Sequence, residues 1–468
     1  REYYKINQIT FYMSMHNASA TPEMGYQDTK YTVEALVEGE WIVIAEFKDS
    51  DSIPRDHKDY DDAMANDKSD YHIPSYYTIT LDKKVNTNNI RVTVSEFAKN
   101  YDGADRLIFP YIYEMRVYAE EGEIPDIELP EGAIVLPGFV DQHIHGAGGS
   151  DGMDATVTDY ETIAKTIAAE GTTSFLVTTM TQSPENITKA MEAVKSYREA
   201  DKGEGARVVG VHLEGPFIAA AHKGAQPLEY VKEPDIQAFD GYNEASGNAI
   251  RIVTLAPEVE GAEALIKHLT EKGVVSSIGH TGAKFADIEK AVSVGASNVT
   301  HTYNAQSALH HREIGTVGSA MLLDELNCEL IADTIHVSVP AMRLLVKNKG
   351  AKKLTLITDA MRAKGIPDGV SELGGQTVYV KNGEARLEDG TLAGSVLRMN
   401  RAVQNMVEKV GVPFTQAVDY ATINPAKTLK MDNEAGSIEV GKRADFTVLN
   451  AKYDVLMTVC GGEIIYKA

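Results

Sequence analysis

The sequence predicts a (β/α)8 TIM barrel, an α/β fold, preceded by a β-sandwich. Two patterns lead to this fold class. Up to about residue 125, apolar and polar residues alternate, as they do on strands with one buried face. After residue 130, short β-branched runs are each followed by a helix-length segment. The 468 residues leave room for two or three domains.

The N-terminal region contains six alternating runs separated by polar turns: INQITFYM, KYTVEALV, EWIVIAEF, YYTITL, NIRVTVSEF and YIYEMRVYAEE. Short strands with frequent turns are typical of an all-β sandwich. Over roughly residues 5–120, the order of these runs resembles discoidin-like galactose-binding domains. A sandwich in this place could bind a glycan, mediate assembly or cover the barrel.

Two features of this region allow alternative interpretations. The segment at residues 49–70, DSDSIPRDHKDYDDAMANDKSD, is rich in Asp and has the carboxylates that calcium prefers, but we favour a solvated loop. Trp41 is the single tryptophan. It could stack on a sugar, but its place inside a strand pattern favours the core.

The barrel prediction depends on eight β-branched runs: IVLPGFVDQHIH, TTSFLVTTM, RVVGVHLEGP, IRIVTLAPE, VVSSIGH, NVTHTYN, CELIAD and KLTLITDA. Segments such as DYETIAKTIAAEG, ENITKAMEAVKSYREA, AEALIKHLTEKG and FADIEKAVSVGA lie between them and have helical apolar spacing. Eight such units in succession predict a TIM barrel. In that fold, functional side chains gather at the carboxyl ends of the strands.

Charge and composition exclude several classes of partner. With 68 acidic and 45 basic side chains the formal charge is −23, so we expect neither nucleic acid nor membrane as a partner. The first residues, REYYKINQITFY, lack the apolar stretch of a signal peptide, and the start at Arg1 suggests that further residues precede it. Cys328 and Cys460 are the only cysteines, which suits a reduced compartment. We expect a cytoplasmic protein.

Ionisable side chains recur at the ends of the predicted barrel strands. They are His143 and His145 after the first run, Glu214 after the third, His280 after the fifth, His301 after the sixth, His336 beyond the seventh and Asp359 after the eighth. Residues two apart on a strand face the same side, so His143 and His145 can face one point. Burying so many polar groups in one barrel mouth is costly unless something pairs with them. A metal ion is the simplest partner.

The residue types also suggest how the metal would be held. Imidazole and carboxylate ligands without thiolate suit zinc, iron, cobalt or manganese. Glu214, His280 and His301 would form one site, and His143 and His145 a second, with Glu214 bridging. Asp359 would accept a proton from water and pass it to a leaving amine. Its alternative role is to cap the next helix.

Ten ordered motifs from residue 136 to 431 resemble the amidohydrolase superfamily and, within it, the N-acetylglucosamine-6-phosphate deacetylase family. They are LPGFVDQHIHG, VGVHLEGPFI, GAQP, SIGHT, VTHTYNA, HHRE, IADTIHV, LITDAM, LAGSVLRMN and NPAKTLKM. The tail GSIEVGKRADFTVLNAKYDVLMTVCGGEIIYKA resembles the family's closing β segment. We therefore expect a sandwich at 1–125, an amidohydrolase barrel at 126–436 and a C-terminal β segment at 437–468. Either the N-terminal strands that usually join this segment lie upstream of Arg1, or the small sheet is built differently.

The resemblance implies roles for the strand-end residues. Glu214, His280 and His301 would bind the principal ion, and Asp359 would act as general base and then general acid. Some relatives replace the first-strand histidines, but His143 and His145 are present here. One or two divalent ions, zinc or iron, are therefore expected. The fourth predicted strand ends in TLAPE and has no lysine that could be carbamylated to bridge two ions.

The resemblance also implies a set of sugar-phosphate contacts: Ala225, Gln226, Asn304, Ala305, His311, Arg312, Asp333, Thr334, Ile335, His336, Leu392, Ala393 and Gly394. Gln226 is nearest to the position that polarises the substrate carbonyl. Thr334 replaces the usual glycine, and because threonine is disfavoured at positive φ we expect this loop to differ slightly. Arg312 would read phosphate, in this family across a dimer interface, or would form a surface salt bridge.

The expected activity is metal-dependent hydrolysis of N-acetyl-D-glucosamine 6-phosphate to D-glucosamine 6-phosphate and acetate, by a homodimer. One alternative is an amidohydrolase that deacetylates another N-acyl amino sugar or an N-acyl amino acid. The other is a non-catalytic carbohydrate-binding protein. Such a protein would lack one of the metal ligands or the general acid, and in this sequence each of these positions carries the expected residue.

Overall fold

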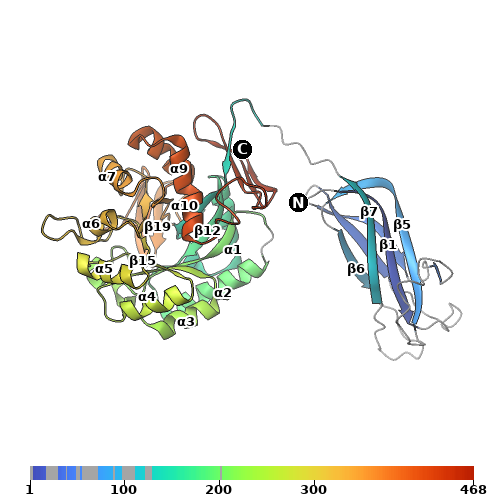
Figure 1. Ribbon diagram of the computed structural model, residues 1–468, viewed down its shortest axis with the longest axis horizontal. Helices are drawn as coiled ribbons and strands as arrows, with labels where there is room; N and C mark the ends of the chain where they lie inside the picture. Colours follow the sequence, from blue (N-terminus) through green and yellow to red (C-terminus); the bar gives the residue numbers. More distant parts are fainter. Residues whose placement is uncertain are drawn as a thin grey trace. The chain divides into compact units, whose positions relative to one another are not determined.

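The computed structural model describes residues 4–16, 30–37, 40–48, 53–54, 72–87, 90–96, 111–121, 129–200 and 203–468. It consists of two compact units, Arg1–Glu128 and Leu129–Ala468 (Figure 1).

The first unit contains two antiparallel sheets. One has the order β4-β5-β1-β7 and the other β3-β2-β6. The strands are β1 Tyr4–His16, β2 Lys30–Val37, β3 Glu40–Lys48, β4 Ile53–Pro54, β5 His72–Thr87, β6 Ile90–Glu96 and β7 Tyr111–Glu121. Each of the six predicted runs is a strand. Ile9 and Ile79 of the larger sheet share one apolar cluster with Tyr31, Val33 and Phe47 of the smaller. The likeness to discoidin domains stays a prediction, and apart from β4 the Asp-rich segment lies outside the described residues.

The prediction that Trp41 lies in the core is wrong. Its side chain is 40% exposed, and the Arg91 guanidinium lies 4.3 Å from its ring centroid. The cause is a bulge in β3, where Val33 pairs with Ala45 but the next residue, Glu34, pairs with Val43. The extra residue reverses the alternation of faces, so Trp41 points outward while Phe47 points inward.

The second unit is built around an eight-stranded parallel sheet with the order β18-β17-β16-β15-β14-β13-β12-β9. Its strands are β9 Phe139–Ile144, β12 Thr172–Thr178, β13 Arg207–Glu214, β14 Ile250–Leu255, β15 Val275–Ile278, β16 Asn298–Val299, β17 Asn327–Ile331 and β18 Leu354–Ile357. All eight predicted runs contribute one strand each. The first and last strands meet where the Asp359 backbone N–H donates to the His143 carbonyl at 2.8 Å, so the sheet nearly closes into the predicted TIM barrel.

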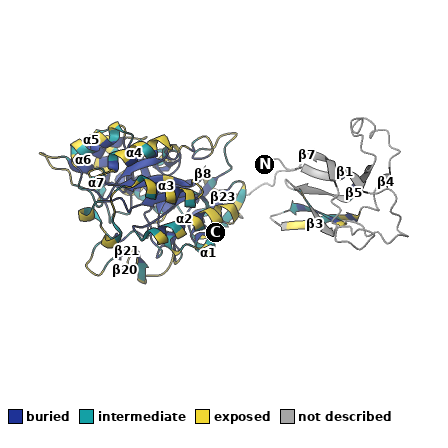
Figure 2. Ribbon diagram, turned by 90° about the horizontal axis from the view of Figure 1, so that it is seen from below, coloured by how far each residue is buried: buried dark blue, intermediate teal, exposed yellow. Residues whose placement is uncertain are grey.

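Helices cover the outside of this barrel. They are α1 Val157–Ala168, α2 Pro184–Ala200, α3 Ile236–Ala245, α4 Ala262–Glu271, α5 Phe285–Ser293, α6 Gly315–Leu322, α7 Val339–Lys349, α8 Met399–Asn405, α9 Phe414–Ala421 and α10 Ile423–Thr428. In α4 the buried residues Ala262, Leu265, Ile266 and Leu269 form one stripe with helical spacing. Figure 2 shows the result, with buried strands inside and exposed outer faces on the helices.

Besides the two-stranded pair of β10 Gly146–Ala147 and β11 Ser150–Asp151, two smaller sheets complete the unit. The first has the order β24-β23-β22-β8 and joins β8 Ile134–Pro137 to the C-terminal strands β22 Phe446–Leu449, β23 Val455–Cys460 and β24 Glu463–Lys467. The predicted first barrel run is therefore divided between this sheet and β9. The second comprises β19 Gly369–Leu373, β20 Gln376–Lys381 and β21 Glu384–Arg386, inserted between β18 and α8.

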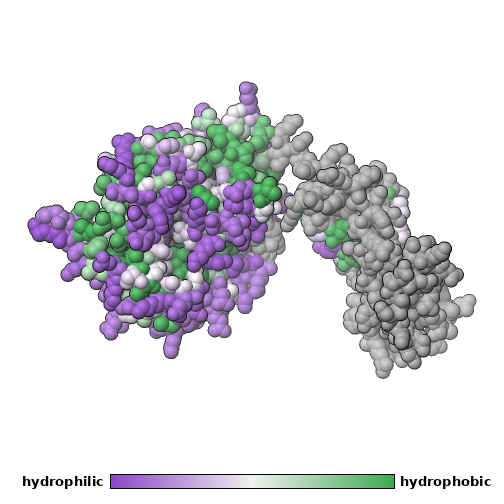
Figure 3. Space-filling view, in the orientation of Figure 1, coloured by the Kyte–Doolittle hydropathy of each residue, from purple (hydrophilic) through white to green (hydrophobic). Residues whose placement is uncertain are grey.

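Polar side chains cover much of the face of the second unit drawn in Figure 3, and apolar side chains form smaller groups among them. Among the described helices, none combines the length and the apolar character that a membrane-spanning helix needs.

Candidate metal-binding and catalytic site

The strand ends of the barrel bring together six of the predicted residues. His143 is in β9, His145 follows it, and Glu214 is the last residue of β13. His280, His301 and Asp359 each lie two residues beyond their strands, β15, β16 and β18. Each of these three has a positive φ, of 49°, 29° and 47° respectively. Non-glycine residues adopt this conformation at a cost, which is typical of functional sites.

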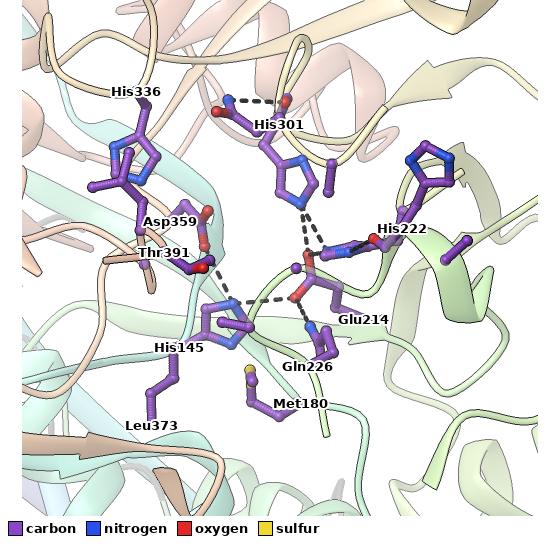
Figure 4. Close-up of a pocket in the computed structure, with 18 residues that line it drawn as sticks. His145, Met180, Glu214, His222, Gln226, His301, His336, Asp359, Leu373 and Thr391 are labelled. Atoms are coloured by element: carbon purple, nitrogen blue, oxygen red, sulfur yellow. Dashed lines mark hydrogen bonds and ion pairs between the residues drawn. The ribbon is translucent and has the colours of Figure 1, made fainter. Parts of the chain in front are cut away.

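Glu214 is at the centre of this group, and its two carboxylate oxygens face different histidines (Figure 4). Oε1 lies 3.1 Å from His301 Nε2 and 3.4 Å from His280 Nε2. The two imidazole nitrogens are themselves 3.1 Å apart. Ligand atoms of all three residues therefore face one point, with every pair within 4.8 Å.

The first-strand histidines form a second group with Asp359. Asp359 Oδ1 lies 3.2 Å from His145 Nε2 and 3.4 Å from His143 Nε2. Glu214 reaches this group too, because its Oε1 is 3.4 Å from His143 Nε2 and its Oε2 is 3.3 Å from His145 Nε2. A bridging position for Glu214 is thus compatible with the geometry.

Asp359 does not cap a helix. It lies two residues after the end of β18, and the next α-helix along the chain begins only at Met399.

Opposite charges determine the protonation of the site. Burial alone would raise the pKa of Asp359, but His143 and His145 lower it to about 2. Burial would likewise lower the pKa of His143, but Asp359, Glu214 and Glu329 raise it to about 9. For Glu214, the surrounding imidazoles hold the pKa well below its usual value despite burial. The carboxylates are therefore ionised at neutral pH and attract cations.

A cavity of about 360 Å³ opens above these groups. The predicted residues that line it are His145, Glu214, Ala225, Gln226, His280, His301, Asn304, Ala305, His336, Asp359, Leu392 and Gly394. His143 lies below its floor, fully buried. His311, Arg312, Asp333, Thr334, Ile335 and Ala393 do not line it.

The loop after β17 shows why only part of the predicted segment reaches the cavity. Asp333 Oδ1 accepts the backbone N–H groups of Ile335 and His336, both at 2.8 Å, and its Oδ2 lies 2.6 Å from His336 Nδ1. Asp333 thus builds the turn and orients the His336 ring. Thr334 has a φ of 71°, so it adopts the left-handed conformation in spite of its branched side chain.

Two further predicted residues lie in different surroundings, Gln226 against the central carboxylate and Arg312 on the surface. Gln226 Nε2 donates to Glu214 Oε2 at 2.7 Å, and Gln226 Oε1 accepts the Thr181 backbone N–H at 2.7 Å. Its amide is thereby held against the central carboxylate. Arg312 is exposed, and its guanidinium lies 2.8 Å from His311 Nε2.

Sequence reasoning missed several cavity residues: Met180, Ala221, His222, Gly224, Leu373 and Thr391. Met180 ends the predicted second run, so the strand-end rule would have found it. His222 supplies the carbonyl that accepts His280 Nδ1–H at 2.9 Å, which leaves His280 Nε2 facing Glu214. Leu373 belongs to the inserted sheet, and no sequence signal places that sheet over the barrel.

The fold and the site define a class. A parallel barrel with imidazoles and carboxylates gathered at its strand ends is a scaffold for metal-assisted hydrolysis. The family model described as "Amidohydrolase family" matches residues 134–465. The chain therefore belongs to the amidohydrolase family.

Within that family it groups with the amino-sugar-phosphate deacetylases. An N-acetylglucosamine-6-phosphate deacetylase from Bacillus subtilis (strain 168) is 42% identical over 343 residues, which cover 73% of this chain and 87% of the relative. An N-acetylgalactosamine-6-phosphate deacetylase from Escherichia coli O157:H7 is 37% identical, over 71% of this chain and 88% of the relative. The solved structure of a mutant N-acetyl-D-glucosamine-6-phosphate deacetylase from Mycobacterium smegmatis, in complex with N-acetyl-D-glucosamine 6-phosphate, aligns with a TM-score of 0.69 at 31% identity, covering 76% and 94% of the two chains.

Proposed function

We propose that this protein hydrolyses the acetamide of N-acetyl-D-glucosamine 6-phosphate, which yields D-glucosamine 6-phosphate and acetate. The observation that carries the proposal is the convergence of Glu214, His280, His301 and Asp359 on one cavity floor. The B. subtilis relative, which bears that activity in its name, is 42% identical.

The residues fit a divalent ion. Glu214, His280 and His301 would hold one ion, and His143 and His145 a second, with Glu214 shared. His143 Nε2 is buried, has no hydrogen-bond partner and is directed at the carboxylates, as a ligand atom would be. Zinc or iron suits these nitrogen and oxygen donors. Such an ion would supply Lewis acidity to the amide carbonyl and lower the pKa of water.

Asp359 would transfer the proton. Its carboxylate is ionised, with a pKa of about 2, so it can accept the proton of the attacking water and deliver it to the departing amine nitrogen. Its Oδ1 lies 3.2 Å from His145 Nε2, so the carboxylate is next to the proposed ligands. Gln226, as a donor to Glu214 Oε2, keeps the central carboxylate in place.

His336, Asn304, Ala305, Ala225 and Gly394 would contact the sugar phosphate from the cavity wall. Arg312 is exposed and outside the cavity wall, so it would bind phosphate in the site of a neighbouring subunit of a homodimer. We place the enzyme in the cytoplasm, which suits the free thiols of Cys328 and Cys460. Glycan binding by the N-terminal unit is a separate hypothesis, for which the exposed Trp41 offers one aromatic face.

A second candidate substrate is N-acetylgalactosamine 6-phosphate. The observation that favours it is the 37% identity to the E. coli relative with that name. The two sugars differ only in the orientation of one hydroxyl, so the same floor serves both and the cavity wall would select between them.

Acetate release from four substrates tests these alternatives: the two 6-phosphates and the two unphosphorylated N-acetyl sugars. The proposal expects the highest kcat/KM on N-acetylglucosamine 6-phosphate. Higher kcat/KM on its galactose epimer would establish the second candidate. No turnover of any of the four by zinc-loaded or iron-loaded protein would overturn both.

A further inference from the structure

Below the candidate ligands, the barrel interior contains a layer of polar side chains instead of apolar ones. Its members are Gln142, His212, Thr254, Ser277, Asn298, Thr300 and Glu329, and all are fully buried. They come from β9, β13, β14, β15, β17 and the segment around β16. Burying this many polar groups is costly unless they are hydrogen-bonded, and within this layer only Gln142 Oε1 is without a partner.

Glu329, in the middle of β17, accepts from four groups. Oε1 lies 2.7 Å from Gln142 Nε2 and 3.1 Å from Asn298 Nδ2. Oε2 lies 3.1 Å from His143 Nδ1 and 3.2 Å from the His301 backbone nitrogen. Three of these partners, the two amide NH2 groups and the backbone N–H, can only donate.

These contacts determine the tautomer of His143. An ionised carboxylate only accepts hydrogen bonds, so the proton in the fourth contact must be on His143 Nδ1. With an ion in place of the second proton, the ring would be neutral and its lone pair would be on Nε2. That atom lies 3.4 Å from both Glu214 Oε1 and Asp359 Oδ1 and has no hydrogen-bond partner.

The rest of the layer has one consistent direction of donation. His212 Nδ1 lies 3.1 Å from the Gln142 carbonyl, so Nδ1 donates and Nε2 accepts from Thr254 at 2.7 Å. Thr254 then accepts from Thr300, which accepts from Ser277, at 2.7 and 2.5 Å. Ser277 accepts from Asn298 Nδ2 at 2.8 Å. The Asn298 amide nitrogen therefore donates to both Ser277 and Glu329.

We propose that Glu329 is a positioning residue for the metal centre: it holds His143 as the Nδ1–H tautomer and directs its Nε2 lone pair at the ion shared with Glu214. Histidine ligands generally need such an outer partner. Glu329 also accepts the backbone N–H of His301, at a residue with positive φ, so one carboxylate supports a ligand in each group. This inference rests on the proposed metal-dependent function.

The variant Glu329→Gln tests the proposal because it keeps the size of the side chain. All four neighbours of Glu329 act as donors. The NH2 group of the introduced glutamine must therefore face at least one donor, whichever way its amide is turned. The matched control is Glu170→Gln, an equally buried carboxylate paired with Lys364 at 2.6 Å. His143→Asn removes the proposed target itself.

The readout is zinc affinity and stoichiometry of the full-length protein, by chelator competition and elemental analysis, with cobalt absorption spectra as a check on coordination. Glu329→Gln should weaken one zinc ion by about 10- to 100-fold. Glu170→Gln should leave zinc binding unchanged. His143→Asn should weaken the same ion, and the double variant Glu329→Gln/His143→Asn should lose less affinity for it than the two single losses combined, because both changes act on the contact between Glu329 and His143.

Wild-type zinc affinity and cobalt spectra in Glu329→Gln would overturn the proposal, as would equal weakening in Glu329→Gln and Glu170→Gln. Either result would leave the proposed function standing if acetate release from the sugar phosphate persists. Wild-type protein that binds no zinc or cobalt and releases no acetate would overturn both.

Discussion

The floor and the rim of the cavity are built in different ways. The floor consists of side chains at strand ends that are at most 8% exposed: Glu214, His280, His301 and Asp359. The rim consists of loop and insertion residues of the cavity wall, such as Leu373 of β19, and of the adjoining loops outside that wall, which carry Arg312 and Thr334. The carboxyl ends of parallel barrel strands always lie together at one end of the barrel, whereas the position of a loop depends on its own particular contacts. We therefore expect substitutions in the floor to affect chemistry and those in the rim to affect selectivity.

The largest effect is expected in the floor, from Asp359→Asn. The amide cannot accept the proton of water, so kcat should fall by about 10²- to 10⁴-fold. Acetate release measures the loss, while zinc content and the thermal midpoint establish that the protein remains loaded and folded. Near-full turnover in a folded, metal-loaded variant would contradict the role of Asp359 and with it the division between floor and rim.

Arg312→Ala examines the rim. If Arg312 binds phosphate, its loss removes a charge-assisted hydrogen bond of about 1.5–3 kcal/mol, or roughly 10- to 100-fold in kcat/KM. The loss should appear only with phosphorylated substrate. Lys267→Ala, at an exposed ion pair on α4, is the control for a removed surface cation. Equal kcat/KM in the wild type and Arg312→Ala would mean that Arg312 takes no part in phosphate binding.

Sequence could predict the floor because strand periodicity and strand order determine it. The eight runs and the six converging residues follow from that rule alone, and Met180 would have followed too. It could not predict what depends on packing between distant segments. The bulge that turns Trp41 outward, the contact of Gln226 with Glu214, and the place of Leu373 over the cavity have no local signal. Glu329 was overlooked because it lies inside a strand run, where position gives no indication of its four partners.

Asp151 lies next to the floor, because the residue after it, Gly152, donates its backbone N–H to the His145 carbonyl. Its buried carboxyl makes the stability of this region depend on pH. It is 2% exposed, and its Oδ2 has no hydrogen-bond partner. Burial raises its pKa to about 6, although His145 partly opposes this. Because the folded pKa exceeds the unfolded value, the contribution of Asp151 to stability is present below about pH 4 and is lost as the pH rises through 6.

Asp151→Asn should therefore stabilise the protein, and the gain should grow by roughly 1 kcal/mol between pH 5 and pH 8. Thermal unfolding at both pH values measures it, with Asp324→Asn, at an exposed site, as the control. A gain that does not depend on pH would mean that Asp151 is not the buried acid inferred here.

The smallest effect is expected in the rim, from Thr334→Gly. Thr334 has a φ of 71°, a conformation that costs an L-residue about 1–2 kcal/mol, and glycine relieves this cost. Glycine also gives the unfolded chain about 0.4–1 kcal/mol of extra conformational entropy, so the net gain should be about 0.5–1 kcal/mol. Asn382→Gly, at a φ of 53°, should gain less because asparagine tolerates this region. Turnover of Thr334→Gly should match the wild type, since Asp333 still holds the turn. Loss of stability together with loss of turnover would instead mean that the branched side chain of Thr334 supports the site, and that this part of the rim is as constrained as the floor.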